Sequence, residues 1–151
     1  MNYVTALVQL PLVRETGKER IKSPDDVARI CADIADLAQE TFHVLMLNTK
    51  NCLINRHVVT IGLADASLVH PREVFRPAIA ENTSAIVLVH NHPSGDSKPS
   101  AEDIKVTKQL IEAGKIVDIT VQDHVIIGKE HEASRGFFSM REHGLCEFGT
   151  Y

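Results

Sequence analysis

The chain has 151 residues, 44% of them hydrophobic and 24% charged, which suits one soluble domain with its own core. Sixteen Lys and Arg against 20 Asp and Glu give a net charge of −4, so no overall positive field attracts nucleic acid. An eight-unit βα barrel needs roughly 200 residues or more, and no apolar run approaches the ~20 residues of a membrane span. The eight histidines outnumber the five Phe and two Tyr, and there is no Trp, so the histidines are where we look for chemistry.

The N-terminal half alternates β-prone and helical patterns. Ser23 and Pro24, followed by two acidic residues, are typical of a helix start, and apolar residues then recur at helical spacing. The predicted elements are an extended segment over 1–22, a helix over 23–40, a hairpin of strands over 42–47 and 52–61, and a helix over 71–81.

The C-terminal half contains the most apolar segment of the chain. Residues 85–89 read Ala-Ile-Val-Leu-Val, which predicts a strand buried on both faces. The elements that follow are predicted as a helix over 100–113 ending at Gly114, strands over 116–121 and 125–127, and a polar tail from 130 with a short helical turn near 137–141. Helices placed between strands predict an α/β fold, a three-layer sandwich in which helices flank a mixed β-sheet.

Cysteine usage points to a reducing compartment. Cys31, Cys52 and Cys146 contain no C-x-x-C pair, and an odd number makes a poor disulfide framework. The N-terminus lacks the basic segment of a secretory signal. We therefore expect a cytoplasmic protein.

His90 and His92 leave the end of the buried strand two residues apart. In extended backbone such side chains point to the same face, so two imidazoles can hold one metal ion. Pro93 favours extended backbone at His92. Asp103, in the first turn of the next helix, is the best third ligand, and Asp96 in the intervening loop is its rival. Two His and one carboxylate leave a position for water, as in catalytic zinc sites.

Each of these features also has a purely structural interpretation. An isolated H-x-H is a weak metal signal, and Ser100 with Asp103 is also an ordinary capping box at a helix start. The combination of a buried strand, H-x-H-P and a capped acidic helix start is what favours a metal site.

The motif resembles that of a known family. The sequence H-x-H-P, with Ser100 eight positions after His92 and Asp103 three positions later, resembles the JAMM metalloprotease signature of JAB/MPN domains. The fuller wording His-Asn-His-Pro-Ser-Gly looks like the bacterial RadC family, and the segments 69–75 and 123–128 resemble that family too. The resemblance implies a JAB/MPN-like, cytidine-deaminase-like fold over 23–143, with 144–151 as a tail.

The resemblance also implies roles for individual residues. It implies Zn²⁺ held by His90, His92 and Asp103, with Ser100 donating a hydrogen bond to the oxyanion of the reaction. The signature has an upstream glutamate that activates water, and Glu40 occupies that place. Glu73 is the alternative, although its context suits an acid at a helix start better.

Ser100 presents a conflict, because one hydroxyl is asked both to cap a helix and to assist the oxyanion. His124 is expected to lie in a hairpin turn, with a supporting role behind the metal ligands as the alternative. His43 is expected to face solvent or a sheet edge.

The main functional hypothesis is a zinc hydrolase that cleaves an amide or isopeptide bond in a protein or a small molecule. One alternative is a DNA-repair-associated role with a nucleic-acid or protein partner. The charge argues against nucleic acid, and we expect no room for the helix-hairpin-helix segment that RadC proteins commonly carry. The other alternative is a non-catalytic interaction scaffold.

Overall fold

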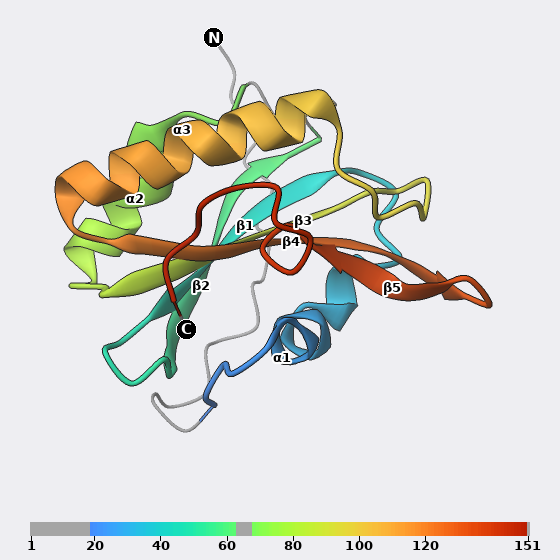
Figure 1. The fold of residues 1–151 in the computed structure, drawn as a ribbon, viewed down its shortest axis with the longest axis horizontal. Helices are drawn as coiled ribbons and strands as arrows, with labels where there is room; N and C mark the ends of the chain where they lie inside the picture. Colours follow the sequence, from blue (N-terminus) through green and yellow to red (C-terminus); the bar gives the residue numbers. More distant parts are fainter. Residues whose placement is uncertain (1–18, 63–67, 151) are drawn as a thin grey trace, which may run out of the picture.

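The computed structural model describes residues 19–62 and 68–150. Its centre is a five-stranded sheet with the strand order β2-β1-β3-β4-β5 (Figure 1). The strands are β1 (Thr41–Leu47), β2 (Leu53–Ile61), β3 (Ala85–Asn91), β4 (Thr120–His131) and β5 (Ser134–Ser139). The β3 and β4 strands are parallel, whereas the other neighbours are antiparallel, so the sheet is mixed.

Helices cover both faces of the sheet and complete the predicted three-layer α/β sandwich. Helices α2 (Pro71–Ala80) and α3 (Ala101–Val117) lie on one face, and α1 (Pro24–Ile30) with a short 3₁₀ turn, η1 (Ala32–Ile34), lies on the other (Figure 1). No helix in the described parts of the chain is long and apolar enough to cross a bilayer.

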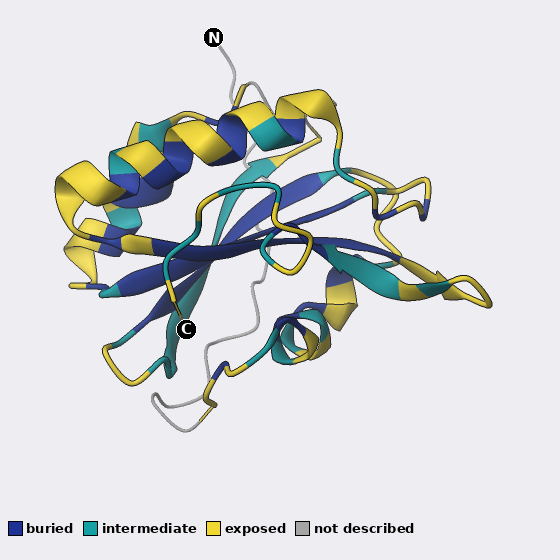
Figure 2. Ribbon diagram, in the orientation of Figure 1, coloured by how far each residue is buried: buried dark blue, intermediate teal, exposed yellow. Residues whose placement is uncertain are grey.

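Figure 2 shows the central strands β1 and β3 buried, and strand alternation divides their side chains between two clusters of the core. Even-numbered residues of β1 and β3, such as Val44 and Leu88, pack with α2 and α3. Odd-numbered residues, such as Leu45 and Val87, pack with α1. Because side chains of a strand alternate between faces, the parity of a residue number at the end of β1 or β3 indicates its side of the sheet.

The first helix is shorter than predicted. It ends at Ile30 rather than at Glu40, and the chain then forms η1 and an irregular segment. Val27, Cys31 and Ile34 are buried as the helical spacing predicts, but Leu37 is 40% exposed. The apolar spacing suggested a longer helix because η1 buries Ile34 in the same core cluster as Val27 and Cys31, although η1 is not α-helical.

Gly114 does not end the third helix, which continues to Val117. A Cβ on Gly114 would lie 2.5 Å from the carbonyl oxygen of Ile119 and 3.3 Å from Phe75 Cζ, so the glycine permits close packing inside the helix. The left-handed residue at the helix end is Asp118, with φ 57°. Asp tolerates that conformation better than most residues.

The C-terminal strands also differ from the prediction. Residues 120–131 form one long strand, so the expected break at 122–124 is wrong, and His124 lies buried in mid-strand rather than in a hairpin turn. The hairpin turn follows His131 instead, and β5 occupies part of the predicted polar tail. Polar residues at 122–124 resembled a turn because their burial depends on partners elsewhere in the chain.

His43 is buried rather than facing solvent. It lies in β1 and is 4% exposed. Its ring is hydrogen-bonded to the Thr41 hydroxyl at 2.8 Å and accepts a hydrogen bond from Arg56 Nε at 3.1 Å. Of the predicted extended segment, residues 1–18 lie outside the described residues, and Ile21 is fully buried in the α1 side of the core.

Candidate metal centre

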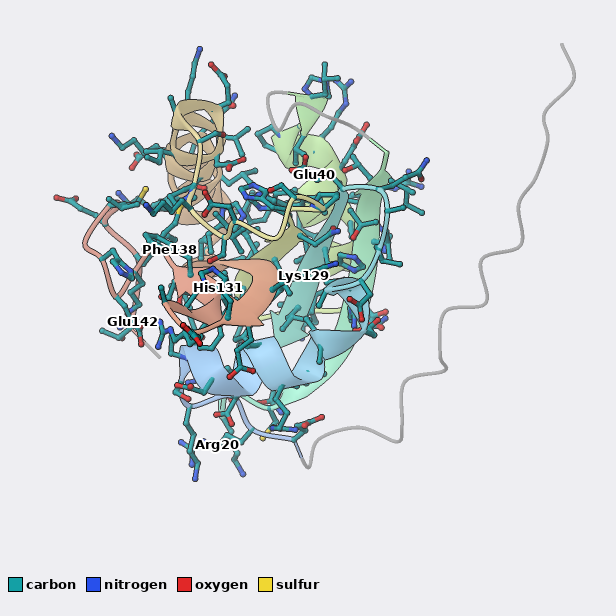
Figure 3. All side chains as sticks on the ribbon, turned by 90° about the vertical axis from the view of Figure 1, so that its right-hand side faces the viewer. Arg20, Glu40, Lys129, His131, Phe138 and Glu142 are labelled. Carbon is teal, nitrogen blue, oxygen red and sulfur yellow. The ribbon has the colours of Figure 1, made fainter. Side chains whose placement is uncertain are left out.

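Four side chains from three parts of the chain meet at one end of the sheet, the end that Figure 3 faces. His90 is the penultimate residue of β3, and His92 follows that strand. Asp103 lies in the first turn of α3, and Glu40 immediately precedes β1. The antiparallel pairing of Phe42 with His90 brings Glu40 to the end of β3 although 50 residues separate it from His90.

The ligand atoms of this group lie within 4.8 Å of one another. His90 Nε2 is 2.9 Å from His92 Nε2 and 3.5 Å from Asp103 Oδ1. His92 Nε2 is 3.3 Å from Asp103 Oδ2, and Glu40 Oε1 is 3.6 Å from His90 Nε2. A tetrahedral zinc ion, with bonds of about 2.0–2.1 Å, spaces its ligands about 3.3 Å apart. The spacing of these nitrogen and oxygen atoms therefore fits a metal ion.

His92 is oriented by the loop that follows it. Its Nδ1 lies 2.8 Å from the backbone carbonyl of Asp96, which can only accept a hydrogen bond. Nδ1 therefore carries the proton, and Nε2 of the neutral ring presents a lone pair to the group. Asp96, the rival third ligand, supplies its backbone rather than its carboxylate, which accepts from the Lys98 N–H.

His90 is oriented by a buried chain of hydrogen bonds. The Thr107 hydroxyl donates to the Asp103 carbonyl at 2.6 Å, so it accepts from His124 Nδ1 at 2.5 Å. Burial lowers the pKa of His124 well below its ordinary value, which keeps the ring neutral with a lone pair on Nε2. That nitrogen lies 2.7 Å from His90 Nδ1 and accepts a hydrogen bond from the Nδ1–H group. In the neutral His90 ring, the lone pair therefore lies on Nε2 and faces the group.

The group therefore attracts positive charge. With both rings in these tautomers, two nitrogen lone pairs face each other at 2.9 Å, an arrangement that a metal ion or a proton between them relieves. Burial opposes the charged form of His92, but Asp103 and the Asp96 carbonyl raise its pKa above the ordinary value. Although burial works against ionisation of Asp103, its contacts with His90 and His92 hold its pKa well below the usual range.

Ser100 caps α3. Its Oγ accepts from the Asp103 N–H at 3.1 Å, and Asp103 Oδ2 accepts from the Ser100 N–H at 2.9 Å, which completes a capping box. A serine hydroxyl has one donor and two acceptor sites, and capping uses an acceptor. The two predicted roles of Ser100 are therefore compatible, because its O–H proton is not used by the cap. Ser100 is exposed, next to Asp103.

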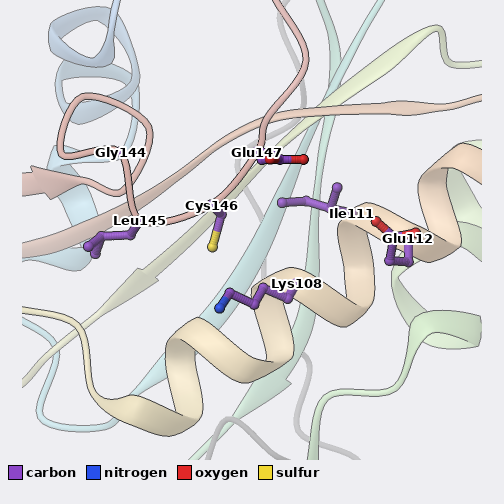
Figure 4. A pocket seen from close by; sticks show the side chains of 7 residues that line it. All are labelled: Lys108, Ile111, Glu112, Gly144, Leu145, Cys146 and Glu147. Atoms are coloured by element: carbon purple, nitrogen blue, oxygen red, sulfur yellow. The ribbon is translucent and has the colours of Figure 1, made fainter.

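Two other features lie apart from the four-residue group. Glu73, the alternative to Glu40, is exposed in the first turn of α2. A hollow of about 500 Å³ lies between α3 and the C-terminal tail, with Lys108 and Cys146 in its lining (Figure 4). Burial raises the pKa of the Cys146 thiol, the opposite of what a nucleophilic cysteine needs.

Three buried side chains support the candidate site, and residue patterns alone assign a role to only one of them. They give Thr107 and Asn91 no role, and they predict His124 as a hairpin-turn residue with a supporting role as the alternative. The available signal was their polarity in positions whose neighbours are apolar. Thr107 and His124 are 0% exposed, as is Asn91, and each forms hydrogen bonds to a segment that holds a member of the group.

The fold and the site define a mixed α/β sandwich with a His, His, Asp and Glu group at the end of its central strands. A family model described as the RadC-like JAB domain matches residues 21–145, and the chain belongs to that family. The resemblance seen in the H-x-H-P motif is thereby confirmed.

Curated relatives extend over most of this chain. A UPF0758 protein of Alkaliphilus oremlandii is 46% identical over 138 residues, which is 91% of this chain and 57% of that protein. A UPF0758 protein of Rubrobacter xylanophilus is 47% identical over 138 residues, 91% of this chain and 58% of its own length. One from Listeria welshimeri is 49% identical over 125 residues, 82% of this chain and 54% of its own. The chain thus spans little more than half the length of these relatives.

Proposed function

We propose that this protein is a zinc-dependent hydrolase of the JAMM type that cleaves an amide or isopeptide bond. The observation that carries the proposal is the spacing of His90 Nε2, His92 Nε2 and the Asp103 carboxylate, with Glu40 beside them. His90, His92 and Asp103 would hold the metal. Zinc bound there would lower the pKa of a water molecule to about 7 and polarise the carbonyl of the substrate.

Glu40 is the proposed proton carrier. Its carboxylate is about one fifth exposed, so it borders both the ring nitrogens and solvent, and Oε1 lies 3.6 Å from His90 Nε2. A base in this position takes the proton of the attacking water and passes it to the leaving amine, which must be protonated for the C–N bond to break.

Ser100 is the proposed oxyanion donor. Because helix capping uses only the acceptor side of its hydroxyl, the O–H can donate to the oxygen on which negative charge develops. Asp103 contributes twice, since Oδ1 faces His90 while Oδ2 accepts from the Ser100 N–H. The same capping box therefore fixes one proposed ligand and the proposed oxyanion donor together.

The first test is metal content. Wild type and His92→Ala are purified in parallel, and zinc is measured by elemental analysis. We expect about one zinc per chain in wild type and a large loss in the variant, because three ligands become two. Equal zinc in both proteins would contradict the site assignment.

The second test is hydrolysis. Zinc-loaded wild type and Glu40→Gln are compared on a panel of fluorogenic peptide amides and lysine isopeptides. Glu40→Gln keeps the shape of the side chain and removes the base, so we expect at least a 10²-fold loss of turnover with zinc retained. Glu73→Gln is the matched control and should match wild type. A zinc-loaded wild type that cleaves nothing on the panel, or a fully active Glu40→Gln, would count against the proposal.

A further inference from the structure

Asn91 lies between the two histidines in sequence but faces the other side of the sheet. Strand alternation directs His90 and Asn91 to opposite faces, and Asn91 shares its face with Val87 and Val89 on the α1 side. The carboxamide is fully buried and lies outside the group of ionisable ligands. A buried carboxamide on the apolar α1 side needs an explanation, because an unpaired amide there is costly.

The explanation lies in the two peptide groups that flank Glu40. Asn91 Oδ1 accepts from the backbone N–H of Thr41 at 2.7 Å, and Asn91 Nδ2 donates to the backbone carbonyl of Gln39 at 3.0 Å. The Thr41 hydroxyl also donates to Oδ1, at 2.9 Å. One side chain therefore holds the residue before Glu40 and the residue after it.

The orientation of this carboxamide is fixed by its partners. A backbone N–H can only donate and a backbone carbonyl can only accept, so the oxygen must face Thr41 and the nitrogen must face Gln39. Both bonds fail if the amide is turned over. Asparagine, which combines a donor and an acceptor in one small group, is suited to this position, whereas aspartate supplies only the acceptor.

These bonds begin where the main-chain pairing ends. The β1–β3 ladder ends with Phe42 opposite His90, and Thr41 is the next residue beyond that end. On the other edge of β1 the Gly62 N–H donates to the Glu40 carbonyl at 2.8 Å. The backbone of Glu40 is thus held from β2 by a main-chain bond and from β3 by the Asn91 side chain. Glu40 and His90, both even-numbered, are left on the opposite face.

We propose that Asn91 is a positioning residue that holds the backbone around Glu40 so that the Glu40 carboxylate faces the two imidazoles. The inference rests on the proposed function, since it concerns the proton carrier named there. Asn91 acts from behind the sheet and through Glu40. A misplacement of about 1 Å in a reacting group can cost on the order of 10²-fold in rate. Loss of the Asn91 hydrogen bonds to Gln39 and Thr41 should therefore have a measurable effect on turnover.

The test follows the Glu40 carboxylate directly. Protein labelled with ¹³Cδ-glutamate is titrated with Zn²⁺, and Glu40→Gln identifies the Glu40 carboxyl resonance. In wild type we expect that resonance to shift as zinc binds. In Asn91→Leu, which removes all three hydrogen bonds of the carboxamide, the shift should be lost while about one zinc per chain still binds. Asn91→Asp keeps the size and the oxygen facing Thr41, replaces only the donor, and should reduce the shift.

Val87→Ala is the matched control, because Val87 lies on the same face of the same strand and is equally buried. It should lose stability while keeping the Glu40 response. On any amide that wild type cleaves, Asn91→Leu should lower kcat about 10–100-fold with KM little changed. If Asn91→Leu does not fold, Asn91→Asp decides.

The outcomes separate the inference from the proposed function. An unchanged Glu40 shift in both Asn91 variants would overturn the inference and leave the proposed function standing. Loss of zinc from the Asn91 variants but not from Val87→Ala would also overturn it, because Asn91 would then hold the ligands instead. A wild type that binds no zinc, or whose Glu40 resonance ignores zinc, would remove the proposed function and the inference together.

Discussion

Thr107→Val probes the hydrogen-bond chain behind His90 with almost no change of side-chain shape. Thr107 is fully buried, and its hydroxyl accepts from His124 Nδ1 while donating to the Asp103 carbonyl. Valine leaves His124 Nδ1–H without a partner. An unsatisfied buried donor costs about 1–3 kcal/mol, so the free energy of unfolding should fall by roughly that amount.

The loss of this hydroxyl should also weaken the metal site. A His124 ring freed from Thr107 can move its proton to Nε2 and donate to His90 Nδ1. The proton of His90 would then lie on Nε2, the nitrogen that faces the group. Removing a hydrogen-bond partner of a metal-ligating histidine typically costs 10–100-fold in affinity, so we expect zinc to bind about 10–100-fold more weakly, or roughly 1.4–2.8 kcal/mol.

Competition with a chromophoric zinc chelator measures the affinity, and urea unfolding measures the stability. Thr83→Val is the matched control, because the buried Thr83 hydroxyl has no hydrogen-bond partner among the described residues and takes no part in the hydrogen bonds that link Thr107, His124 and His90. It should leave zinc affinity unchanged and should not reduce stability. If Thr107→Val binds zinc as tightly as Thr83→Val does, the proposed proton arrangement of His90 is wrong.

Two further predictions concern stability. Burial and then Arg56 lower the pKa of His43 from 6.5 to about 4, so the unfolded chain binds a proton that the folded chain does not as pH falls between those values. The contribution of His43 to stability should therefore fall by about 2 kcal/mol from pH 7 to pH 5. In urea unfolding, His43→Gln should show a correspondingly weaker pH dependence than wild type, and an equal slope in both would refute the assignment. Gly114→Ala should lower the free energy of unfolding by about 1–3 kcal/mol despite the better helix propensity of alanine, because its Cβ would lie 2.5 Å from the Ile119 carbonyl oxygen. An unchanged thermal midpoint for this variant would contradict the prediction, because it would show that the backbone at Ile119 moves away from the added Cβ with little loss of stability.

Local rules were sufficient for the parts of the fold that depend on neighbouring residues. The helix start at Pro24, the capping box of α3 and the buried strand β3 all follow from short patterns and agree with the structure. The errors occurred where the local pattern has two physical solutions. The apolar spacing after Ile30 is satisfied by a 3₁₀ turn as well as by an α-helix, and polar residues at 122–124 suit a turn unless distant partners bury them.

The candidate site divides in the same way. By itself the sequence determined that His90 and His92 share a face and that Ser100 and Asp103 meet in a capping box, since a strand period and a helix start are local properties. The tertiary structure alone decided that Glu40 lies beside His90, because that contact depends on the antiparallel register of β1 and β3.

The supporting side chains of the site belong to the tertiary structure as well. Leu88 of β3 pairs with His124 of β4 in the parallel register, and α3 crosses back over the sheet to place Thr107 against that ring. No local pattern of residues encodes a pairing register between strands more than 30 positions apart. For this protein the residue types of the candidate metal site could be inferred from sequence, but the protonation and orientation of those side chains are set by partners that only folding brings together.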